Sequence, residues 1–136
     1  MKRKAFTMME LIFVIVILGI LAGVAVPRLG ATRDDAAITK GIADIAAIRN
    51  SISLLRSENL LTGNNAFPAT IDNGAGNLFA PVLDYPISET GRYWARVNQT
   101  TFTFTVAGVA TTFTYNPADG RFTCVAGAGN CDILTR

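Results

Sequence analysis

Residues 5–27 of the chain read AFTMMELIFVIVILGILAGVAVP. The 17 residues between Glu10 and Arg28 carry no charge, and most of them are Leu, Ile, Val or Phe. A helix of that length is about 25 Å long, close to the ~30 Å hydrocarbon core of a bilayer. Because large apolar side chains are costly to expose to water, we expect this segment to lie in lipid or in a bundle of helices.

Charged residues flank the start of this segment. Residues 2–4 are a basic triplet within a short leader, and Glu10 lies at the entrance of the apolar run. A carboxylate near the edge of a bilayer needs a cationic partner, and no neighbour on its own helix supplies one. The leader, the small residue Ala5 and the sequence from Phe6 to Glu10 resemble the class III signal of the type IV pilin and pseudopilin superfamily. The resemblance covers residues 1 to about 30.

The resemblance implies a processing site and an assembly contact. A membrane-bound prepilin peptidase would remove the leader, residues 1–5, by cutting between Ala5 and Phe6, and would methylate the new amine of Phe6. The family usually has Gly before the cut, whereas this chain has Ala. The new ammonium group could pair with Glu10 of the same subunit or with Glu10 of a neighbouring subunit, and only the second pairing sets the register of a filament. An acidic residue merely tolerated at a lipid interface is the alternative.

Small residues and a proline lie in the second half of the segment 6–28. Gly19 and Gly23 are four residues apart, a spacing that lets helices approach closely. Pro27 removes the backbone hydrogen bond to the carbonyl of Gly23. We expect residues 19–27 to be helical in the membrane and able to unwind in a filament, as the resemblance also implies.

The basic leader predicts the orientation of the segment. Basic flanks stay in the cytoplasm, so we expect a single pass through the inner membrane with the N-terminus inside, followed by assembly into a periplasmic or extracellular filament. A cleavable secretory signal is the rival interpretation, because residues 23–25 imitate a signal-peptidase site. The length of the apolar run and Glu10 at its entrance count against this rival.

Residues 29–62 carry an amphipathic helical pattern. Large aliphatic residues recur every three or four positions, at Ile38, Ile42, Ile45, Ile48, Ile52 and Leu55. Charged residues fall largely between them, so one face of the helix is suited to dock on a sheet. Gly63 and the two asparagines after it predict the end of the helix.

Residues 63–91 are rich in Gly, Asn and Pro and show little periodicity. We expect a solvated loop, of the kind that varies within the superfamily and forms its contact surface. Asp72, Asn73 and Asn77 offer oxygen ligands, and calcium sites occur in some pseudopilins, but one carboxylate in six residues is a weak calcium pattern. We therefore predict neither a metal ion nor a cofactor.

Residues 92–136 show the alternation of an antiparallel sheet. We expect strands at 92–97, 101–106, 112–115 and 121–125. Aromatic residues can share the face that covers the helix, namely Phe102, Phe104, Phe113 and Phe122. We favour this core role over a stacking platform for DNA or for electron transfer. The expected fold class is α+β, a long N-terminal helix packed on about four antiparallel strands, as in type IV pilins.

Cys124 and Cys131 enclose six residues, a segment flexible enough to close a disulfide. A disulfide is expected outside the cytoplasm and would join the carboxyl end to the last strand. Many type IV pilins have such a disulfide-bounded C-terminal loop. A redox or metal pair is the alternative, although the chain has neither CxxC spacing nor any His.

Composition argues against an enzyme and against a nucleic-acid-binding protein. The chain has no His for general base catalysis, and without the three leader cations it has 9 basic and 10 acidic side chains. The resemblance implies a structural pilin that polymerises with copies of itself, on an inner-membrane assembly platform and in contact with membrane lipid. The first alternative is a pseudopilin of a type II secretion or DNA-uptake machine, and the second is a membrane-anchored binding protein.

Overall fold

The computed structural model describes the backbone of residues 6–136 and the side chains of residues 6–25 and 33–136. The chain divides into two compact units, one ending at Asp35 and the other comprising Ala36–Arg136. The second unit contains the sheet and the hydrophobic core, and we call it the head unit. The predicted leader, residues 1–5, lies outside the described residues.

One long helix, α1 (Met8–Leu61), supplies the helical part of both units. Its backbone stays helical through Pro27. The helix ends at Leu61, just before the predicted stop at Gly63. Gly63 has a φ of +82° and donates its N–H to Leu60 O at 3.0 Å. A glycine in this left-handed conformation satisfies the last carbonyl groups of a helix without steric cost.

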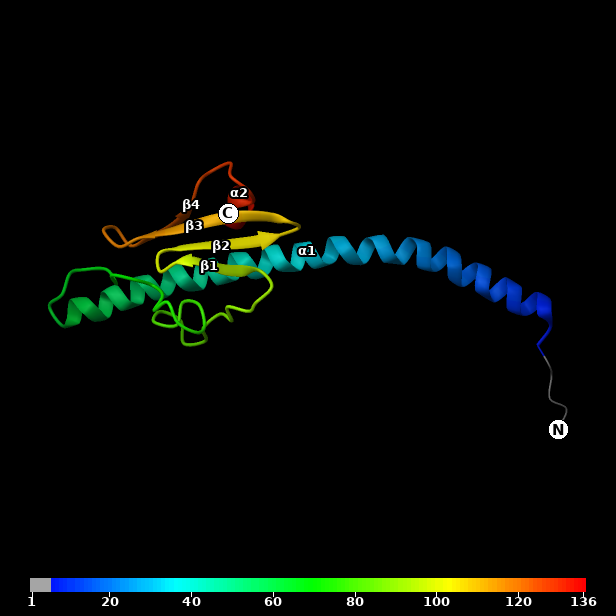
Figure 1. The fold of residues 1–136 in the computed structure, drawn as a ribbon, viewed down its shortest axis with the longest axis horizontal. Coiled ribbons are helices and arrows are strands. Elements are labelled where there is room, and N and C mark those ends of the chain that lie inside the picture. Colours follow the sequence, from blue (N-terminus) through cyan, green and yellow to red (C-terminus); the bar gives the residue numbers. More distant parts are fainter. Residues whose placement is uncertain (1–5) are drawn as a thin grey trace, which may run out of the picture. The chain divides into compact units, whose positions relative to one another are not determined.

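The head unit contains a four-stranded antiparallel sheet in the order β1-β2-β3-β4 (Figure 1). The strands are β1 (Trp94–Asn98), β2 (Thr101–Val106), β3 (Val109–Asn116) and β4 (Arg121–Cys124). Each pairs with the next through a short connection, and β1 carries an irregularity between Arg96 and Asn98. The α+β fold class predicted from the sequence is confirmed.

Five strand ends differ from the predictions by one to three residues, and β1 and β3 each end one residue later than predicted. β1 begins two residues later than predicted and β4 ends one residue earlier. β3 begins at Val109 rather than Thr112, because Ala107 and Gly108 form a two-residue turn with φ values of 51° and 77°. A turn with two positive φ angles matches the twist of the flanking strands, so pairing resumes at once between Val106 and Val109.

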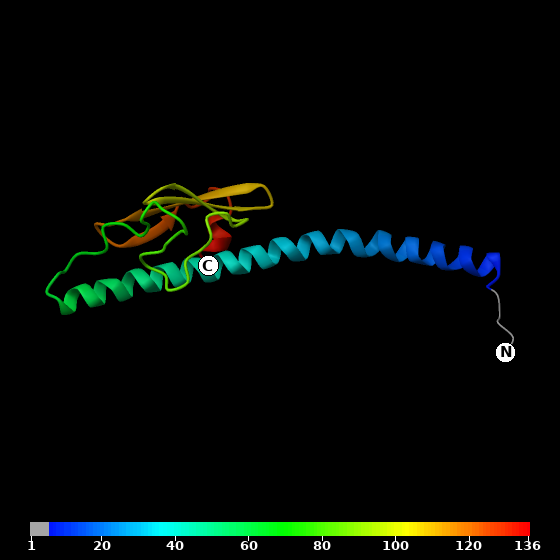
Figure 2. The ribbon, with the colours of Figure 1, turned by 60° about the horizontal axis from the view of Figure 1, so that its bottom comes forward.

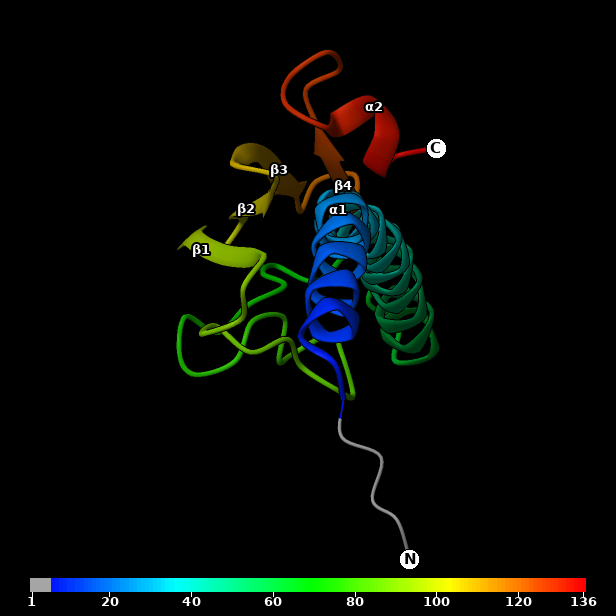
Figure 3. The same ribbon diagram turned by 90° about the vertical axis from the view of Figure 1, so that its right-hand side faces the viewer.

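The core lies between one face of α1 and the inner face of the sheet (Figure 3). The four predicted phenylalanines are all buried there, and their rings form an aromatic cluster with Phe79 and Trp94. On α1, Ile45, Ile48 and Ile52 are fully buried. The outer members of the predicted stripe, such as Ile38 and Leu55, are only partly buried, since the sheet covers the middle of this face.

Gly41 lets α1 and the sheet approach closely. A Cβ atom at this position would lie 2.6 Å from Cζ of Phe104 and 2.9 Å from Cδ2 of Leu134. Real Cβ contacts are not that short, so any larger residue at position 41 must displace the helix or the two side chains.

The segment 63–91 is not the solvated loop that we predicted. Ile71, Leu78 and Phe79 are fully buried, and Phe79 lies at the centre of the aromatic cluster. Asp72 is also fully buried, whereas we expected it to be solvated. The segment therefore completes the core along the side of the sheet next to β1, where Figure 1 shows it as the green coil.

The carboxyl end of the chain is fixed by a disulfide between Cys124 and Cys131, as the sequence predicts. Cys131 also begins a short helix, α2 (Cys131–Leu134), that the sequence analysis missed. Leu134 of α2 is buried beside Gly41 of α1, and Figure 2 shows α2 lying against the long helix. The disulfide thus ties the last strand to a segment that packs on α1.

Candidate functional site: the N-terminal helix

Thr7 caps the start of α1. Its Oγ1 accepts the N–H of Glu10 at 3.3 Å, and its carbonyl accepts the N–H groups of Glu10 and Leu11 at 3.1 and 3.2 Å. Thr followed three residues later by Glu is the sequence signature of a capping box, and the sequence analysis overlooked it. The cap places Glu10 in the first turn of the helix, where the helix dipole favours a negative charge.

The carboxylate of Glu10 is exposed, and in the described part of the chain no hydrogen bond or ion pair engages it. Phe6, one helical turn earlier, is 80% exposed and precedes the helix. Among the described side chains, Glu10 is therefore free to accept a further partner. The proposed cut after Ala5 falls at the edge of the described residues, so cleavage and methylation stay predictions.

The next helical turns form a wholly exposed apolar surface. Met8–Ala25 has a mean hydropathy of 2.7, and none of it is buried. By length and composition it is able to cross a membrane. A hydrophobic surface of this size needs a cover of lipid or protein.

Gly19 and Gly23 have open space around them. A Cβ at either position would meet nothing within 4 Å, so no contact in the described part of the chain requires glycine there. Small residues at this spacing permit close approach of another helix. The side chain of Pro27 lies outside the described ones, and unwinding of residues 19–27 in a filament stays a prediction.

Asp72, the one carboxylate of the possible calcium loop, is occupied by protein donors. Its oxygens accept from the N–H groups of Gly74 and Phe79 at 2.6 and 3.0 Å and from the guanidinium of Arg96 at 2.9 Å. The hydrogen bond to Asp72 raises the pKa of Arg96, against the opposing effect of burial. Arg96 also pairs with Glu89 at 2.9 Å. An arginine therefore takes the place that a cation would need.

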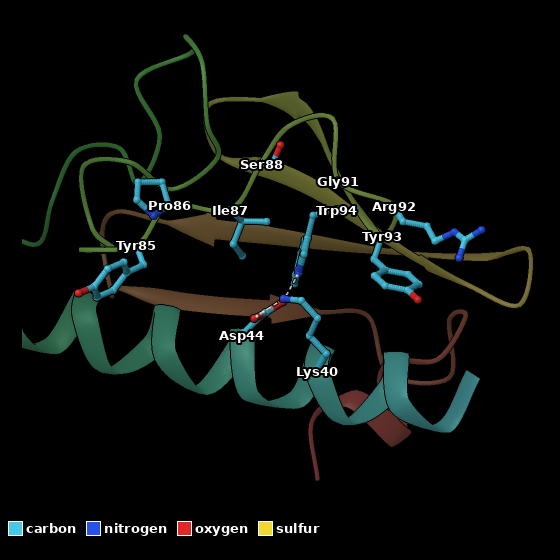
Figure 4. A pocket seen from close by; sticks show the side chains of 10 residues that line it. All are labelled: Lys40, Asp44, Tyr85, Pro86, Ile87, Ser88, Gly91, Arg92, Tyr93 and Trp94. Atoms are coloured by element: carbon cyan, nitrogen blue, oxygen red, sulfur yellow. Dashed lines mark hydrogen bonds and ion pairs between the residues drawn. The ribbon is translucent and has the colours of Figure 1, made fainter. Parts of the chain in front are cut away.

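A pocket of about 420 Å³ lies in the head unit between α1 and the segment before β1 (Figure 4). Asp44 forms its floor, accepts the indole N–H of Trp94 at 3.0 Å and pairs with Lys40 at 2.8 Å. Tyr85 and Tyr93 form opposite walls. The carboxylate of Asp44 is thus engaged by two protein donors, one from α1 and one from β1.

Comparison with known proteins identifies the motif at the amino end. Residues 1–26 match the family model for the prokaryotic N-terminal methylation motif. The chain is also 36% identical over 82 residues to type II secretion system core protein G of Escherichia coli (strain K12), an alignment that covers 60% of this chain and 53% of that protein. The amino end of the chain is thus that of the type IV pilin and pseudopilin superfamily.

Further relatives in this superfamily carry the same description. Core protein G of Vibrio cholerae is 38% identical over 69 residues, which cover 51% of this chain and 44% of that protein. Core protein G of Aeromonas hydrophila is 36% identical over 69 residues, or 51% and 45% of the two chains. The matched region spans about half the length of these curated relatives. No solved structure matches the chain significantly.

The motif and the similarity to core protein G together indicate the type of protein. The chain is a pilin-like subunit, and members of this superfamily are structural proteins and not enzymes. The long helix and the packed antiparallel sheet form the pilin-like α+β architecture. The apolar helix and the prepilin motif are consistent with an inner-membrane protein that assembles into a filament.

Proposed function

We propose that this chain is a pseudopilin, the repeating subunit of a short filament in a type II secretion machine. The observation that carries the proposal is the similarity to type II secretion core protein G over half of the chain or more. This similarity favours a pseudopilin over the subunit of an extended type IV pilus, which was our first interpretation of the sequence. A DNA-uptake pseudopilus is the closest remaining alternative.

In this proposal, prepilin peptidase removes residues 1–5 and methylates the amine of Phe6. Before assembly, the subunit lies in the inner membrane with Met8–Ala25 in lipid. The lipid covers the exposed apolar surface of this segment. Transfer of this helix from lipid into a helical bundle exchanges one apolar surround for another, so it costs little hydrophobic free energy. The inner-membrane assembly platform can therefore extract the subunit with a modest input of energy.

Glu10 would select the register of the incoming subunit. Its carboxylate is exposed in the first turn of α1 and has no partner among the described residues. In an apolar bundle an unpaired carboxylate is costly, whereas one paired with the Phe6 ammonium of a neighbouring subunit is stabilised. Only one axial position of the incoming helix satisfies that pairing.

The test is replacement of Glu10 by Ala in the full precursor, with filaments measured by shearing and by chemical cross-linking. We expect normal membrane insertion and no filaments. The matched control is Glu58→Ala, which removes an exposed carboxylate from the head part of the same helix and should leave assembly unchanged. Normal assembly of the Glu10→Ala protein would favour a simple membrane anchor for a binding protein.

Mass spectrometry of the mature protein tests the processing step. A chain beginning with N-methylated Phe6 is expected. A chain that begins downstream of the apolar helix would instead support a cleaved secretory signal, and would remove the basis for polymerisation.

A further inference from the structure

A pocket of about 380 Å³ lies between α1 and the outer edge of β4. It is lined by Arg49 and Ser53 of α1 and by residues 120–123. β4 is last in the strand order, so its outer side has no neighbouring strand in the described sheet. Arg49 reaches across this edge and donates from Nε to the carbonyl of Phe122 at 3.1 Å. A helix side chain thus covers part of an open sheet edge.

The pocket is rich in hydrogen-bond donors. The N–H and C=O of one strand residue point to the same side, so the Phe122 N–H also faces away from β3 and toward the pocket. Within the described part of the chain, the two Nη atoms of Arg49 have no acceptor. Arg121 is exposed, and its contact with Asp119 is long, at 3.7 Å. Two guanidinium groups and an amide therefore converge on a space that holds no carboxylate.

The opposite edge of the sheet presents a complementary surface. Tyr85 is 92% exposed, and the exposed Asp84 precedes it. Hydrogen bonds of 2.7 and 3.0 Å between Leu78 and Ile87 hold the base of this loop. The Asp84 carboxylate has no hydrogen bond or ion pair to any described residue. Figure 4 shows Tyr85 beside Pro86 and Ile87, across the pocket from Trp94 of β1.

We infer that Asp84 and Tyr85 of one subunit dock into the pocket at the β4 edge of the next subunit. The Asp84 carboxylate accepts hydrogen bonds from Arg49 and Arg121, and the Tyr85 ring lies against the guanidinium of Arg121. The occupant is a second copy of this chain, because the same chain carries an unpaired acidic residue beside an exposed aromatic one.

The two surfaces lie at opposite edges of one sheet, so the contact is heterologous and generates an open series of subunits. This inference rests on the proposed filament and adds a contact between head units to the contact between N-terminal helices. It covers the side chain of Tyr85, which is 92% exposed in the single chain.

Charge reversal in the full-length precursor tests the contact in cells that contain the assembly machinery. Asp84→Arg and Arg121→Glu are each expected to lower filament yield about tenfold, since each places like charges in contact. The combined variant should assemble severalfold better than either single variant, because the pair with position 121 is re-formed with reversed polarity while Arg49 still opposes the new cation at position 84. Combining Glu58→Arg with Arg121→Glu changes the charge equally without re-forming the pair and should not restore assembly.

The outcomes separate this inference from the proposed function. If the wild-type chain forms no filament, the proposed function fails. If wild type assembles and both single variants assemble equally well, or if the combined variant does not recover, the docking contact is wrong. Fluorescence of Trp94 on heating checks that each variant keeps its folded head unit.

Cysteine cross-linking gives a second and independent measurement. A chain with both Ser53→Cys and Tyr85→Cys should form a ladder of covalent multimers on mild oxidation of filaments, whereas each single variant should stop at dimers or monomers. Native Cys124 and Cys131 are bonded to each other and do not compete in folded subunits. Absence of the ladder from assembled filaments would overturn the contact.

Discussion

Apolar side chains have opposite surroundings in the two units of the chain. In Met8–Ala25 every residue is exposed, whereas in the head unit aromatic and aliphatic side chains fill one closed core. The charged groups differ in the same way: Glu10 has no partner among the described residues, while the buried Asp72 has several. The core of the head unit is thus formed by the unit's own side chains, whereas the apolar surface of the N-terminal helix needs lipid or protein from outside to cover it.

The largest effect should come from breaking the buried ion pair of the head unit. Arg96→Met leaves the Asp72 carboxylate buried without its cation, so we expect the free energy of unfolding to fall by about 3–5 kcal/mol. Trp94 is the single tryptophan of the chain and lies in the head core, so its fluorescence measures this unfolding directly. The exposed Arg92→Met is the matched control and should change stability by less than about 0.5 kcal/mol. Equal effects of the two changes would contradict the role of Asp72.

The disulfide should have the next largest effect. Replacing Cys124 and Cys131 by Ala together is expected to lower the free energy of unfolding by about 2.5 kcal/mol, because a short closed loop is released in the unfolded state. Reduction of the wild-type protein should lower the free energy of unfolding by the same amount. Trp94 fluorescence measures the unfolding in both experiments. A reducing agent that also destabilises the double Ala variant would show that the measured loss has another origin.

Two glycines of the same helix provide a direct comparison of the units. Gly41→Leu should destabilise the head unit by about 1–3 kcal/mol, because the new side chain meets Phe104 and Leu134. Gly19→Leu has open space in the isolated chain, so the melting temperature of the head in detergent should not change. If Gly19→Leu nevertheless reduces filament yield, close helix packing at Gly19 in the filament is supported. Identical melting of the two variants would contradict the close approach at Gly41.

The smallest effect concerns Tyr115 and pH. Its hydroxyl donates to the carbonyl of Pro68 at 2.6 Å, and burial, followed by the charge of Asp119, raises its pKa above 10.0. A raised pKa in the folded state contributes stability that is present below about pH 10 and is lost as pH rises through the folded-state value. Tyr115→Phe should cost about 1 kcal/mol at neutral pH.

The same variant should reduce the decline in stability between about pH 10 and 12, measured by chemical denaturation of the full chain in detergent. If the stability of wild type and that of the Phe variant decline in parallel over this pH range, a group other than Tyr115 causes the loss of stability.

Sequence patterns predicted the elements that depend on nearby residues. The apolar run, the glycine stop after α1, the strict alternation of β2 and the disulfide were all found where they were expected. The segment 63–91 was misinterpreted, because its Gly, Asn and Pro content indicates turns but says nothing about Phe79 entering the core. The burial of Asp72 depends on Arg96, which lies 24 residues later. No pattern in the residues around Asp72 predicts that Arg96 is its partner.

The sequence by itself determined that this protein has an apolar N-terminal helix with an acidic residue at its entrance, because hydropathy and charge are properties of consecutive residues. It also determined the helix-then-sheet order, since the two periodicities are local. Only the tertiary structure decided that Gly41 is a contact point, that α2 packs beside it, and that Asp72 is an internal anion. Each of these depends on atoms brought together from distant parts of the chain, whose distances are set by packing and not by sequence spacing.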